Sequence, residues 1–284
     1  MDIKSVENID FDTLFHAFEN AFYDYEVNFD KEEIRSILTR RGYDPRLSFA
    51  AFVDDEIVSF TLNGFGHFNG IPTAYDTGTG TVKDFRGEGI AGKIFSHSLP
   101  FLKASGVKQY LLEVLQNNHK AIKIYHKMGF ETIREFDCFR QDIAEIENVE
   151  AIKPKAAIQI ESVDVDAVRG AGNFCDFSPS WQNSFESIER GKQGLTCFGA
   201  ILSGILVGYC VIDHTAGDLT QIAVSPEWRR KGIATRLLHR ALSMMNTDFI
   251  KVLNVPTDDS SIHGFLSSKN IPLMNKQLEM TLMF

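Results

Sequence analysis

The stretch Phe85-Arg86-Gly87-Glu88-Gly89-Ile90-Ala91 returns later in the chain as Trp228-Arg229-Arg230-Lys231-Gly232-Ile233-Ala234. Arg229 follows Arg86 by 143 positions, which is close to half of the 284-residue chain. Each copy follows a strand-like run that ends in valine and a polar turn, and each precedes a helical pattern of apolar residues. A repeat at half the chain length, in matching surroundings, indicates two copies of one α/β unit.

The sequence on both sides of the repeat also agrees between the two halves. Each half begins with a short strand and helical periodicity and continues with two strands joined by a tight turn. After the glycine-rich stretch, each half carries another strand, a helix and a closing strand. In the first half these elements are predicted at residues 2–6, 47–53, 57–62, 109–115, 118–128 and 130–136, and in the second at 158–163, 196–201, 205–212, 249–253, 258–268 and 277–284.

These matches predict two tandem α/β domains with mixed sheets, at residues 1–140 and 156–284, joined by a polar linker at 141–155. A single large domain with a chance similarity is the alternative. Pro100 has no amide hydrogen for the carbonyl of the preceding turn, so we expect the helix after the first glycine-rich stretch to kink or end early. Residues 64–70 predict a glycine-rich turn, either a hairpin end or an acceptor-site loop.

Composition and charge exclude several classes of protein. The net charge is −9, and an acidic chain is not attracted to phosphate backbones or anionic membranes, so we expect neither nucleic acid nor a membrane as partner. The four cysteines form no CxxC pair and the histidines show no metal-ligand spacing, so we expect no metal, no disulfide framework and a reducing compartment. Without a signal-peptide pattern or an apolar run long enough to span a bilayer, the sequence favours a cytoplasmic protein.

Glycines that open a helix after a strand are typical of phosphate binding. The backbone N–H groups of a helix N-terminus have no internal partners and lie at the positive end of the helix dipole, and glycine allows a ligand to approach closely. Gly87-x-Gly89-x-x-Gly92 also matches the dinucleotide fingerprint, which is a weak signal by itself. Three strands precede it here, and Arg230 replaces the first glycine in the second copy, so both features argue against a dinucleotide.

The pattern Arg-x-x-Gly-x-Ala, shared by both copies, resembles the acetyl-CoA signature of the GNAT superfamily of N-acetyltransferases. The first half continues the resemblance with Leu112-Glu113-Val114, Asn118, Ala121, Tyr125 and Gly129-Phe130 at the family's spacing. The likeness covers most of residues 1–140 and fewer positions of 156–284. It implies two tandem GNAT-like acyl-CoA N-acyltransferase domains with acetyl-CoA as cosubstrate and no metal.

The resemblance also implies which residues hold acetyl-CoA. Backbone N–H groups near the end of the fourth strand would bind the acetyl carbonyl, the glycine-rich stretch would bind the diphosphate, and Asn118 would contact the pantetheine arm or cap the following helix. The cofactor-binding residues implied in this way are Thr81, Val82, Lys83, Arg86, Gly87, Glu88, Gly89, Ile90, Ala91, Gly92 and Asn118 in the first half and Val224, Arg229, Gly232 and Ala234 in the second.

Acetyl transfer to an amine needs a base for the amine proton and an acid for the leaving thiolate. Tyr125 matches the tyrosine that acts as general acid in the family, although a packing role is the alternative. Glu113 matches a glutamate that serves as base in some members, with a purely structural carboxylate as the alternative. Asp76, on the preceding strand, is the reserve candidate for the base.

The second copy departs from this pattern. Phe265 aligns with Tyr125, and Asp258 aligns with Asn118, so the second half lacks the tyrosine hydroxyl. We therefore expect the first domain to be catalytic and the second to be degenerate or to shape the substrate site.

The expected function is an acetyl-CoA-dependent N-acetyltransferase that acts on a primary amine of a small molecule or a peptide, by direct attack in a ternary complex. A non-catalytic tandem acyl-CoA-binding sensor or scaffold is the alternative, and an NAD-dependent enzyme is a weaker one. The sequence leaves open the identity of the amine, the acyl chain preference and whether the chain forms a homodimer.

Overall fold

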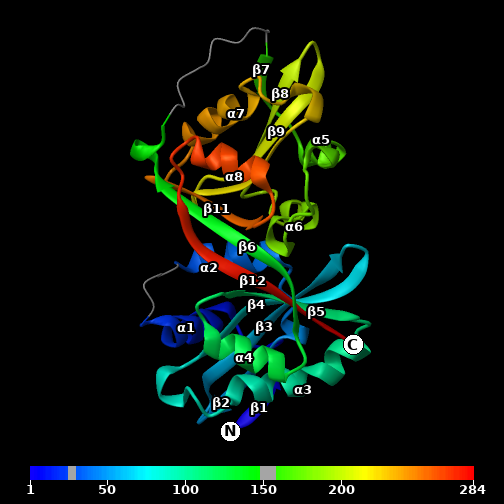
Figure 1. Ribbon diagram of the computed structural model, residues 1–284. Helices are drawn as coiled ribbons and strands as arrows, with labels where there is room; N and C mark the ends of the chain where they lie inside the picture. Colours follow the sequence, from blue (N-terminus) through cyan, green and yellow to red (C-terminus); the bar gives the residue numbers. More distant parts are fainter. Residues whose placement is uncertain (25–29, 148–157) are drawn as a thin grey trace. The chain divides into compact units, whose positions relative to one another are not determined.

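The computed structural model describes residues 1–24, 30–147 and 158–284 (Figure 1). The chain divides into two compact units. Unit 1 consists of residues 1–133 and 279–284, and unit 2 of residues 134–278. These limits differ from the predicted domains, because most of the strand after residue 130 belongs to unit 2 and the last six residues belong to unit 1. Residues 148–155 of the predicted linker lie outside the described residues.

Unit 1 is a sheet between two layers of helices. Its strands follow the order β1-β2-β3-β4-β5-β12, antiparallel up to β4, with β4 and β5 parallel. The elements are β1 (Asp2–Ser5), α1 (Phe11–Phe22), α2 (Lys31–Arg41), β2 (Phe49–Val53), β3 (Glu56–Phe68), β4 (Ile71–Thr81), α3 (Ile90–Ala104), β5 (Gln109–Leu115), α4 (His119–Lys127) and the end of β12 (Leu273–Met283).

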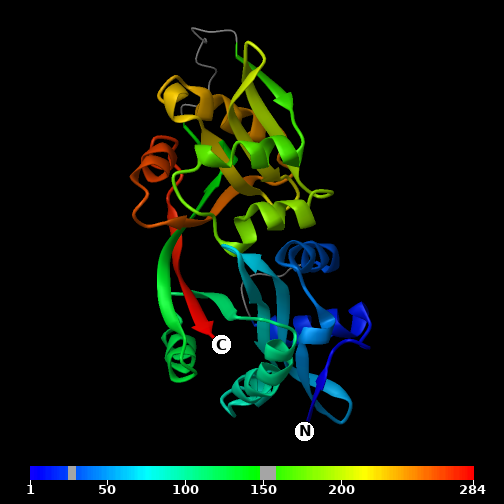
Figure 2. The same cartoon turned by 90° about the vertical axis from the view of Figure 1, so that its right-hand side faces the viewer.

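Alternating side chains of the unit 1 strands fill two cores. Ala50, Phe60 and Leu62 pack against α1 and α2, whereas Phe49 and Ala51 pack against α3. This alternation is the period-two pattern of a sheet that is covered on both faces. Figure 2 shows α1 and α2 in blue on one side of the unit 1 strands and α3 in teal on the other.

Unit 2 repeats this arrangement. Its strands follow the order β6-β11-β10-β9-β8-β7, α5 and α6 cover one face, and α7 packs on the other. The elements are β6 (Glu131–Asp142), β7 (Ile158–Ser162), α5 (Val165–Gly170), α6 (Phe185–Arg190), β8 (Thr196–Leu202), β9 (Ile205–Asp213), β10 (Asp218–Val224), α7 (Ile233–Leu242), β11 (Phe249–Pro256) and α8 (Ser260–Ser267), together with the first part of β12.

The closing strands of the two halves are exchanged. β6, which follows the first half in sequence, pairs antiparallel with β11 of unit 2 from Phe136 to Asp142. The end of β12 lies in unit 1, where Phe284 donates its N–H to the carbonyl of Lys108 at 2.9 Å. Both strands were predicted from their own sequence, but each pairs in the unit that the other half builds.

Two local expectations need correction, although the hairpin-end alternative for residues 64–70 is confirmed. Residues 64–68 belong to β3, and the turn consists only of Asn69 and Gly70, which both have positive φ as a two-residue hairpin turn requires. The helix α3 does not end early but continues through Pro100 to Ala104. Among the described residues, no helix is long and apolar enough to cross a membrane.

Gly64 is predicted to be intolerant of any side chain. A Cβ at this position would collide with the carbonyl oxygen of Arg41, which is backbone and cannot rotate away. We expect Gly64→Ala to lower the free energy of unfolding by about 1–3 kcal/mol, as overpacking does. Urea denaturation measures this, with Gly170→Ala as the control because a Cβ there meets nothing within 4 Å. Equal stability of the two variants would contradict the packing described here.

Candidate active site

In each unit, two parallel strands pair over only part of their length, and the space between their unpaired carboxyl ends is called the cleft of that unit. Thr73–Tyr75 of β4 pair with Gln109–Leu111 of β5, although β4 continues to Thr81. In unit 2 the parallel pairing of β10 with β11 is at Asp218 and Lys251, although β10 continues to Val224. The strand ends beyond these pairs can therefore accept a ligand between them.

A β-bulge lies just beyond the paired part of each cleft. The register of β3 and β4 shifts so that Thr77 is an extra residue, and the register of β9 and β10 shifts so that Thr220 is extra. The two bulges are 143 positions apart, the same offset as the glycine-rich stretches. A bulge redirects strand side chains and backbone groups, and bulges are common beside active sites.

The glycine-rich stretches form the N-termini of α3 and α7. Gly89 and Gly232 are the N-cap residues in left-handed conformation, with φ of 72° and 81°. The first helical hydrogen bond in α3 is donated by Lys93 to Gly89 at 3.1 Å, so the N–H groups of Ile90, Ala91 and Gly92 precede it and are directed out of the helix. In unit 2 the matching bond runs from Arg236 to Gly232 at 3.1 Å. Both helix ends can therefore bind an anion through their backbones.

The two loops differ in residue type at one position where both backbones are left-handed. Gly87 has φ of 90°, and Arg230, at the equivalent place, has φ of 60°. The unit 2 loop therefore keeps the same backbone path despite the change of residue. A non-glycine residue adopts this left-handed region only at a cost in conformational energy.

The arginine of each loop donates hydrogen bonds to backbone carbonyls and to an aspartate of its own unit. Arg86 donates from Nε to the Thr81 carbonyl at 3.0 Å, from Nη2 to the Ala21 carbonyl at 2.8 Å, and to both oxygens of Asp24. The resemblance assigned Arg86 to the cofactor; its guanidinium instead connects the loop to α1. The Arg86 hydrogen bonds hold the pKa of the Asp24 carboxyl below its ordinary value, so Asp24 is charged at neutral pH.

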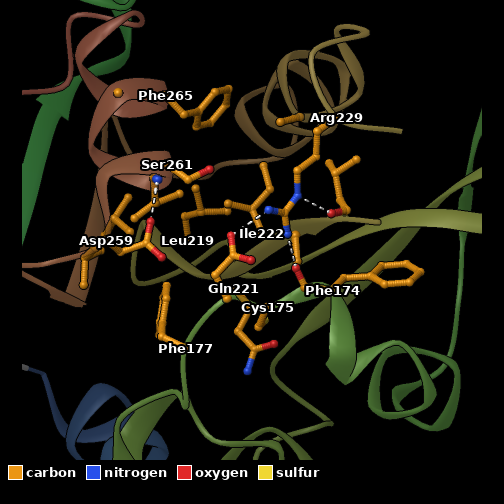
Figure 3. A pocket seen from close by; sticks show the side chains of 18 of the residues that line it. Phe174, Cys175, Phe177, Leu219, Gln221, Ile222, Arg229, Asp259, Ser261 and Phe265 are labelled. Atoms are coloured by element: carbon orange, nitrogen blue, oxygen red, sulfur yellow. Dashed lines mark hydrogen bonds and ion pairs between the residues drawn. The ribbon is translucent and has the colours of Figure 1, made fainter. Parts of the chain in front are cut away.

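Arg229 repeats this arrangement in unit 2. It donates to the carbonyls of Val224 and Phe174 at 3.0 and 2.9 Å and to Asp176 at 2.8 Å. Figure 3 shows these contacts as dashed lines beside the cavity. The sequence reasoning missed Asp24 and Asp176, because each lies more than 50 positions before its arginine.

Asp24→Asn is expected to raise the KM for acetyl-CoA about two- to fivefold and to leave kcat unchanged, since a partly exposed ion pair contributes modestly. The loop would be less well held while the reacting groups stay in place. Steady-state kinetics measures both constants, with Asp84→Asn, an exposed loop carboxylate without this contact, as the control. A change confined to kcat would contradict this positioning role.

At the end of β4, not all of the backbone N–H groups expected to bind the acetyl carbonyl face the cleft. Val82 donates its N–H to the Val58 carbonyl of β3 at 2.9 Å, so it is not available to an acetyl carbonyl. Because antiparallel residues alternate between the two strand edges, the backbone groups of Thr81 and Thr79 face β5 instead. Lys83 begins the short turn after the strand and lies 5.7 Å from the ring of Tyr23. Thr81 is thus the residue of the predicted trio whose amide faces the cleft.

Three more residues expected to bind the cofactor in unit 1 lie in the loop or at a helix N-terminus. Glu88 is exposed in the loop, and Ile90 has a buried side chain, 2% exposed, so it can contribute only its N–H. Asn118 is the N-cap of α4 and accepts a hydrogen bond from Ala121 N–H at 3.2 Å. Its capping role is therefore seen directly.

Tyr125 lies on α4, and its ring contacts that of Phe130 with centroids 5.5 Å apart. Burial and the nearby Asp76 carboxylate raise the pKa of Tyr125, so its hydroxyl is protonated at neutral pH. Asp76 itself precedes the bulge and accepts hydrogen bonds from the Thr79 hydroxyl at 2.9 and 3.1 Å. Burial raises the pKa of Asp76 to about 6. The bulge thus sets a carboxylate near the hydroxyl of Tyr125.

Glu113 lies on β5 and is held by another tyrosine. Tyr75, which is 1% exposed, donates its hydroxyl to Glu113 Oε2 at 2.6 Å. Burial, together with the charge of Glu113, raises the pKa of Tyr75, so this hydroxyl stays a donor. The contact orients one oxygen of the Glu113 carboxylate.

The backbone of unit 2 corrects the alignment of its last helix. Phe130 donates its N–H to Tyr125 at 3.0 Å, and Ile271 donates to Leu266 at the same distance. Asp259, not Asp258, caps α8 as Asn118 caps α4. Leu266 is therefore the structural equivalent of Tyr125. The conclusion that unit 2 lacks the hydroxyl is unchanged.

The cleft of unit 2 opens into a cavity of about 690 Å³. Its walls come from β10, β11, the N-terminus of α7, α8 and the segment before α6. Val224, Arg229, Gly232 and Ala234, the residues expected from sequence, all line it. Figure 3 shows Phe265 of α8, Gln221 of β10 and Phe177 around this cavity. The volume is within the usual range for a small-molecule or cofactor site.

A mixed sheet whose central parallel strands separate, with a bulge on one strand and an anion-binding helix N-terminus after it, defines an acyl-CoA-transferase type of fold present twice. The model of the acetyltransferase (GNAT) family matches residues 6–130 and 169–265. The chain therefore belongs to the GNAT acetyltransferase family.

Individual proteins agree with this assignment. An acetyltransferase of Pectobacterium atrosepticum is 30% identical over 138 residues, which are 49% of this chain and 91% of that protein. A GCN5-related N-acetyltransferase from Sphaerobacter thermophilus superposes with a TM-score of 0.72 at 13% identity, covering 99% of this chain and 95% of that one. A tandem GNAT protein from the clavulanic acid biosynthesis pathway gives 0.71 at 12% identity, covering 99% and 98%. The structural likeness supports the tandem fold predicted from sequence.

Proposed function

We propose that the protein is an acetyl-CoA-dependent N-acetyltransferase that acetylates a primary amine of a small molecule or a peptide, with the reaction in the cleft of unit 1. The observation that carries this proposal is the combination, in unit 1, of an anion-binding helix end with a protonated tyrosine and a carboxylate near the bulge. Unit 2 repeats the helix end but has Leu266 in place of the tyrosine.

The residues of both clefts fit coenzyme A. The N–H groups at the start of α3 and α7 suit the diphosphate, and the left-handed glycines leave room for it. The edges of β4 and β10 that face away from β3 and β9 offer backbone donors to the amides of the pantetheine arm. Bound acetyl-CoA supplies an activated acetyl group, and the residues of this chain supply the orientation and the proton transfers.

The acid and the base come from different elements. Tyr125 donates its proton to the leaving sulfur, which its raised pKa allows because the hydroxyl is protonated before the reaction. Glu113 accepts the proton of the attacking amine, and Tyr75 holds its carboxylate in place. The Thr81 N–H faces the cleft at the end of β4 that leads to α3, where it is a donor for the pantetheine arm.

Asp76 is a second candidate for the base, favoured by one specific observation. Its pKa of about 6 means that it is charged at neutral pH and yet holds a proton more strongly than an ordinary aspartate. Its charge also raises the pKa of Tyr125. A base with a pKa close to the working pH is effective in proton transfer.

The pH dependence of the reaction separates the two carboxylates. If the charged form of Asp76 accepts the proton, kcat/KM should rise about tenfold per pH unit below pH 6 and level off above it. In that case we expect Asp76→Asn to remove this limb and Glu113→Gln to retain it. A limb that survives Asp76→Asn and vanishes in Glu113→Gln would assign the base to Glu113 alone.

The proposed function is tested by incubating the protein with acetyl-CoA and a panel of primary amines and peptides. Release of free coenzyme A together with an acetylated amine is expected for at least one acceptor. Tight binding of acetyl-CoA without turnover on any acceptor would instead support a tandem acyl-CoA sensor.

A further inference from the structure

The cleft of unit 2 is closed at its inner end by Asn183. We propose that this cleft binds free coenzyme A in preference to acetyl-CoA, which makes it a site that responds to the product of the reaction. This inference rests on the proposed function, which assigns coenzyme A to the clefts.

The geometry of unit 2 determines where the tip of a bound coenzyme A would lie. α7 begins after the carboxyl end of β10, so a diphosphate at its N-terminus lies at the open end of the cleft. The rest of the molecule must extend between β10 and β11 toward their parallel pair at Asp218 and Lys251. The sulfur, at the far end of the arm, therefore approaches this pair.

Asn183 connects the two walls at that inner end. Its Nδ2 donates to the Leu253 carbonyl of β11 at 2.8 Å, and its own carbonyl accepts from Gln221 Nε2 of β10 at 2.6 Å. Lys251 donates to Gly217 at 2.7 Å, which shows that alternate residues of β11, including Leu253, face β10. Asn183 is 5% exposed and lines the cavity. An acetyl group would have to displace this side chain.

The chemistry of Asn183 points in the same direction. Its Oδ1 is buried and has no hydrogen-bond partner among the described residues. A thiol can donate a hydrogen bond to this oxygen after a small adjustment, whereas a thioester presents only acceptors. A buried acceptor without a donor is unfavourable, so the end of the cleft favours a ligand that carries a donor.

A chain of hydrogen bonds keeps Asn183 in this position. Tyr209 donates its hydroxyl to Gln221 Oε1 at 2.9 Å, which leaves Gln221 Nε2 directed at Asn183. Cys175 lies 3.0 Å from the Tyr209 hydroxyl and must be the donor there, because the hydroxyl proton is already engaged. At the equivalent positions unit 1 has Phe22, Phe60 and Gly78. The polar inner end is thus a property of unit 2 and not of the repeated fold.

The experiment uses the full chain with the unit 1 site weakened by Ala91→Glu, which sets a negative charge at the N-terminus of α3. Titration calorimetry then measures Kd for coenzyme A and for acetyl-CoA. We expect acetyl-CoA to bind about tenfold more weakly. Adding Asn183→Ala should strengthen acetyl-CoA binding and bring the ratio close to one. Asn183→Ser serves as a second, more conservative variant, and circular dichroism checks that both Asn183 variants are folded. The ratio of the two Kd values in the Ala91→Glu protein tests the inference even if both Asn183 variants misfold.

Each outcome decides a different point. Equal affinities in the Ala91→Glu protein, or a tenfold ratio that survives Asn183→Ala, would overturn this inference alone. Binding that is lost with Ala91→Glu but kept with the matched Ala234→Glu would also overturn it, while the assignment of the reaction to unit 1 stands. No binding of either compound to the unaltered chain would refute the proposed function itself.

Discussion

Tyr125→Phe is expected to lower kcat for acetyl transfer by about 10²–10³-fold, since general acid catalysis typically contributes a factor of this order. The KM for acetyl-CoA should change little, because the ring and its contact with Phe130 remain. Steady-state kinetics with a saturating amine measures both constants. The loss should be confined to the chemical step, which a single-turnover experiment isolates.

A matched control distinguishes catalysis from packing. Tyr43→Phe removes the hydroxyl of another partly buried tyrosine in unit 1, which packs against α1 and α2 and not in the cleft. We expect it to retain nearly full kcat. If Tyr125→Phe is as active as Tyr43→Phe, Tyr125 is a packing residue and unit 1 lacks the proposed acid.

Ala91→Glu is expected to raise the KM for acetyl-CoA by about 10²-fold, the second large effect. The substitution places a negative charge among the N–H groups that would bind the diphosphate. The carboxylate repels the diphosphate and competes with it for the positive end of the helix dipole. Initial rates over a range of acetyl-CoA concentrations measure this. kcat at saturation should remain within a few-fold of the unaltered protein.

Ser96→Glu provides the control for Ala91→Glu. It adds the same charge to an exposed position of α3, about one and a half turns after Ala91. An equal rise in KM for both variants would mean that overall charge, and not the helix N-terminus, governs binding.

Much of the fold could be predicted because the sequence repeats. Two weak strand patterns support each other when they recur in the same order, and the glycine-rich stretches mark where each helix begins. The resemblance to the family rests on Arg86, Gly89 and Ala91 and on their repeat in the second half. The element positions agree closely with the structure for the same reason.

The pairing of the closing strands could not be predicted. The sequence predicts closing strands at residues 130–136 and 277–284 but does not show which sheet edge each strand joins. The sequence order suggested that each half closes its own sheet, and the structure instead exchanges them. A pairing partner depends on long-range geometry that a local pattern does not contain.

The site residues divide in the same way. Tyr125, Glu113 and Asn118 were predicted from the resemblance to the family, whereas the Thr77 bulge is a register shift that leaves no mark in composition. Val82 was expected to face the ligand, but strand alternation turns its N–H toward β3. The alignment of Phe265 with Tyr125 was wrong by one residue. The segment between the glycine-rich stretch and the last helix is two residues shorter in the second half, so the offset between the halves falls from 143 at Arg86 and Arg229 to 141 at the N-caps of α4 and α8.

The most direct measurement is a crystal structure of the protein with acetyl-CoA. We expect a diphosphate within hydrogen-bond distance of the N–H groups of Ile90, Ala91 and Gly92, with the sulfur facing the Tyr125 hydroxyl. A diphosphate located away from the N-terminus of α3, or a sulfur out of reach of Tyr125, would contradict it.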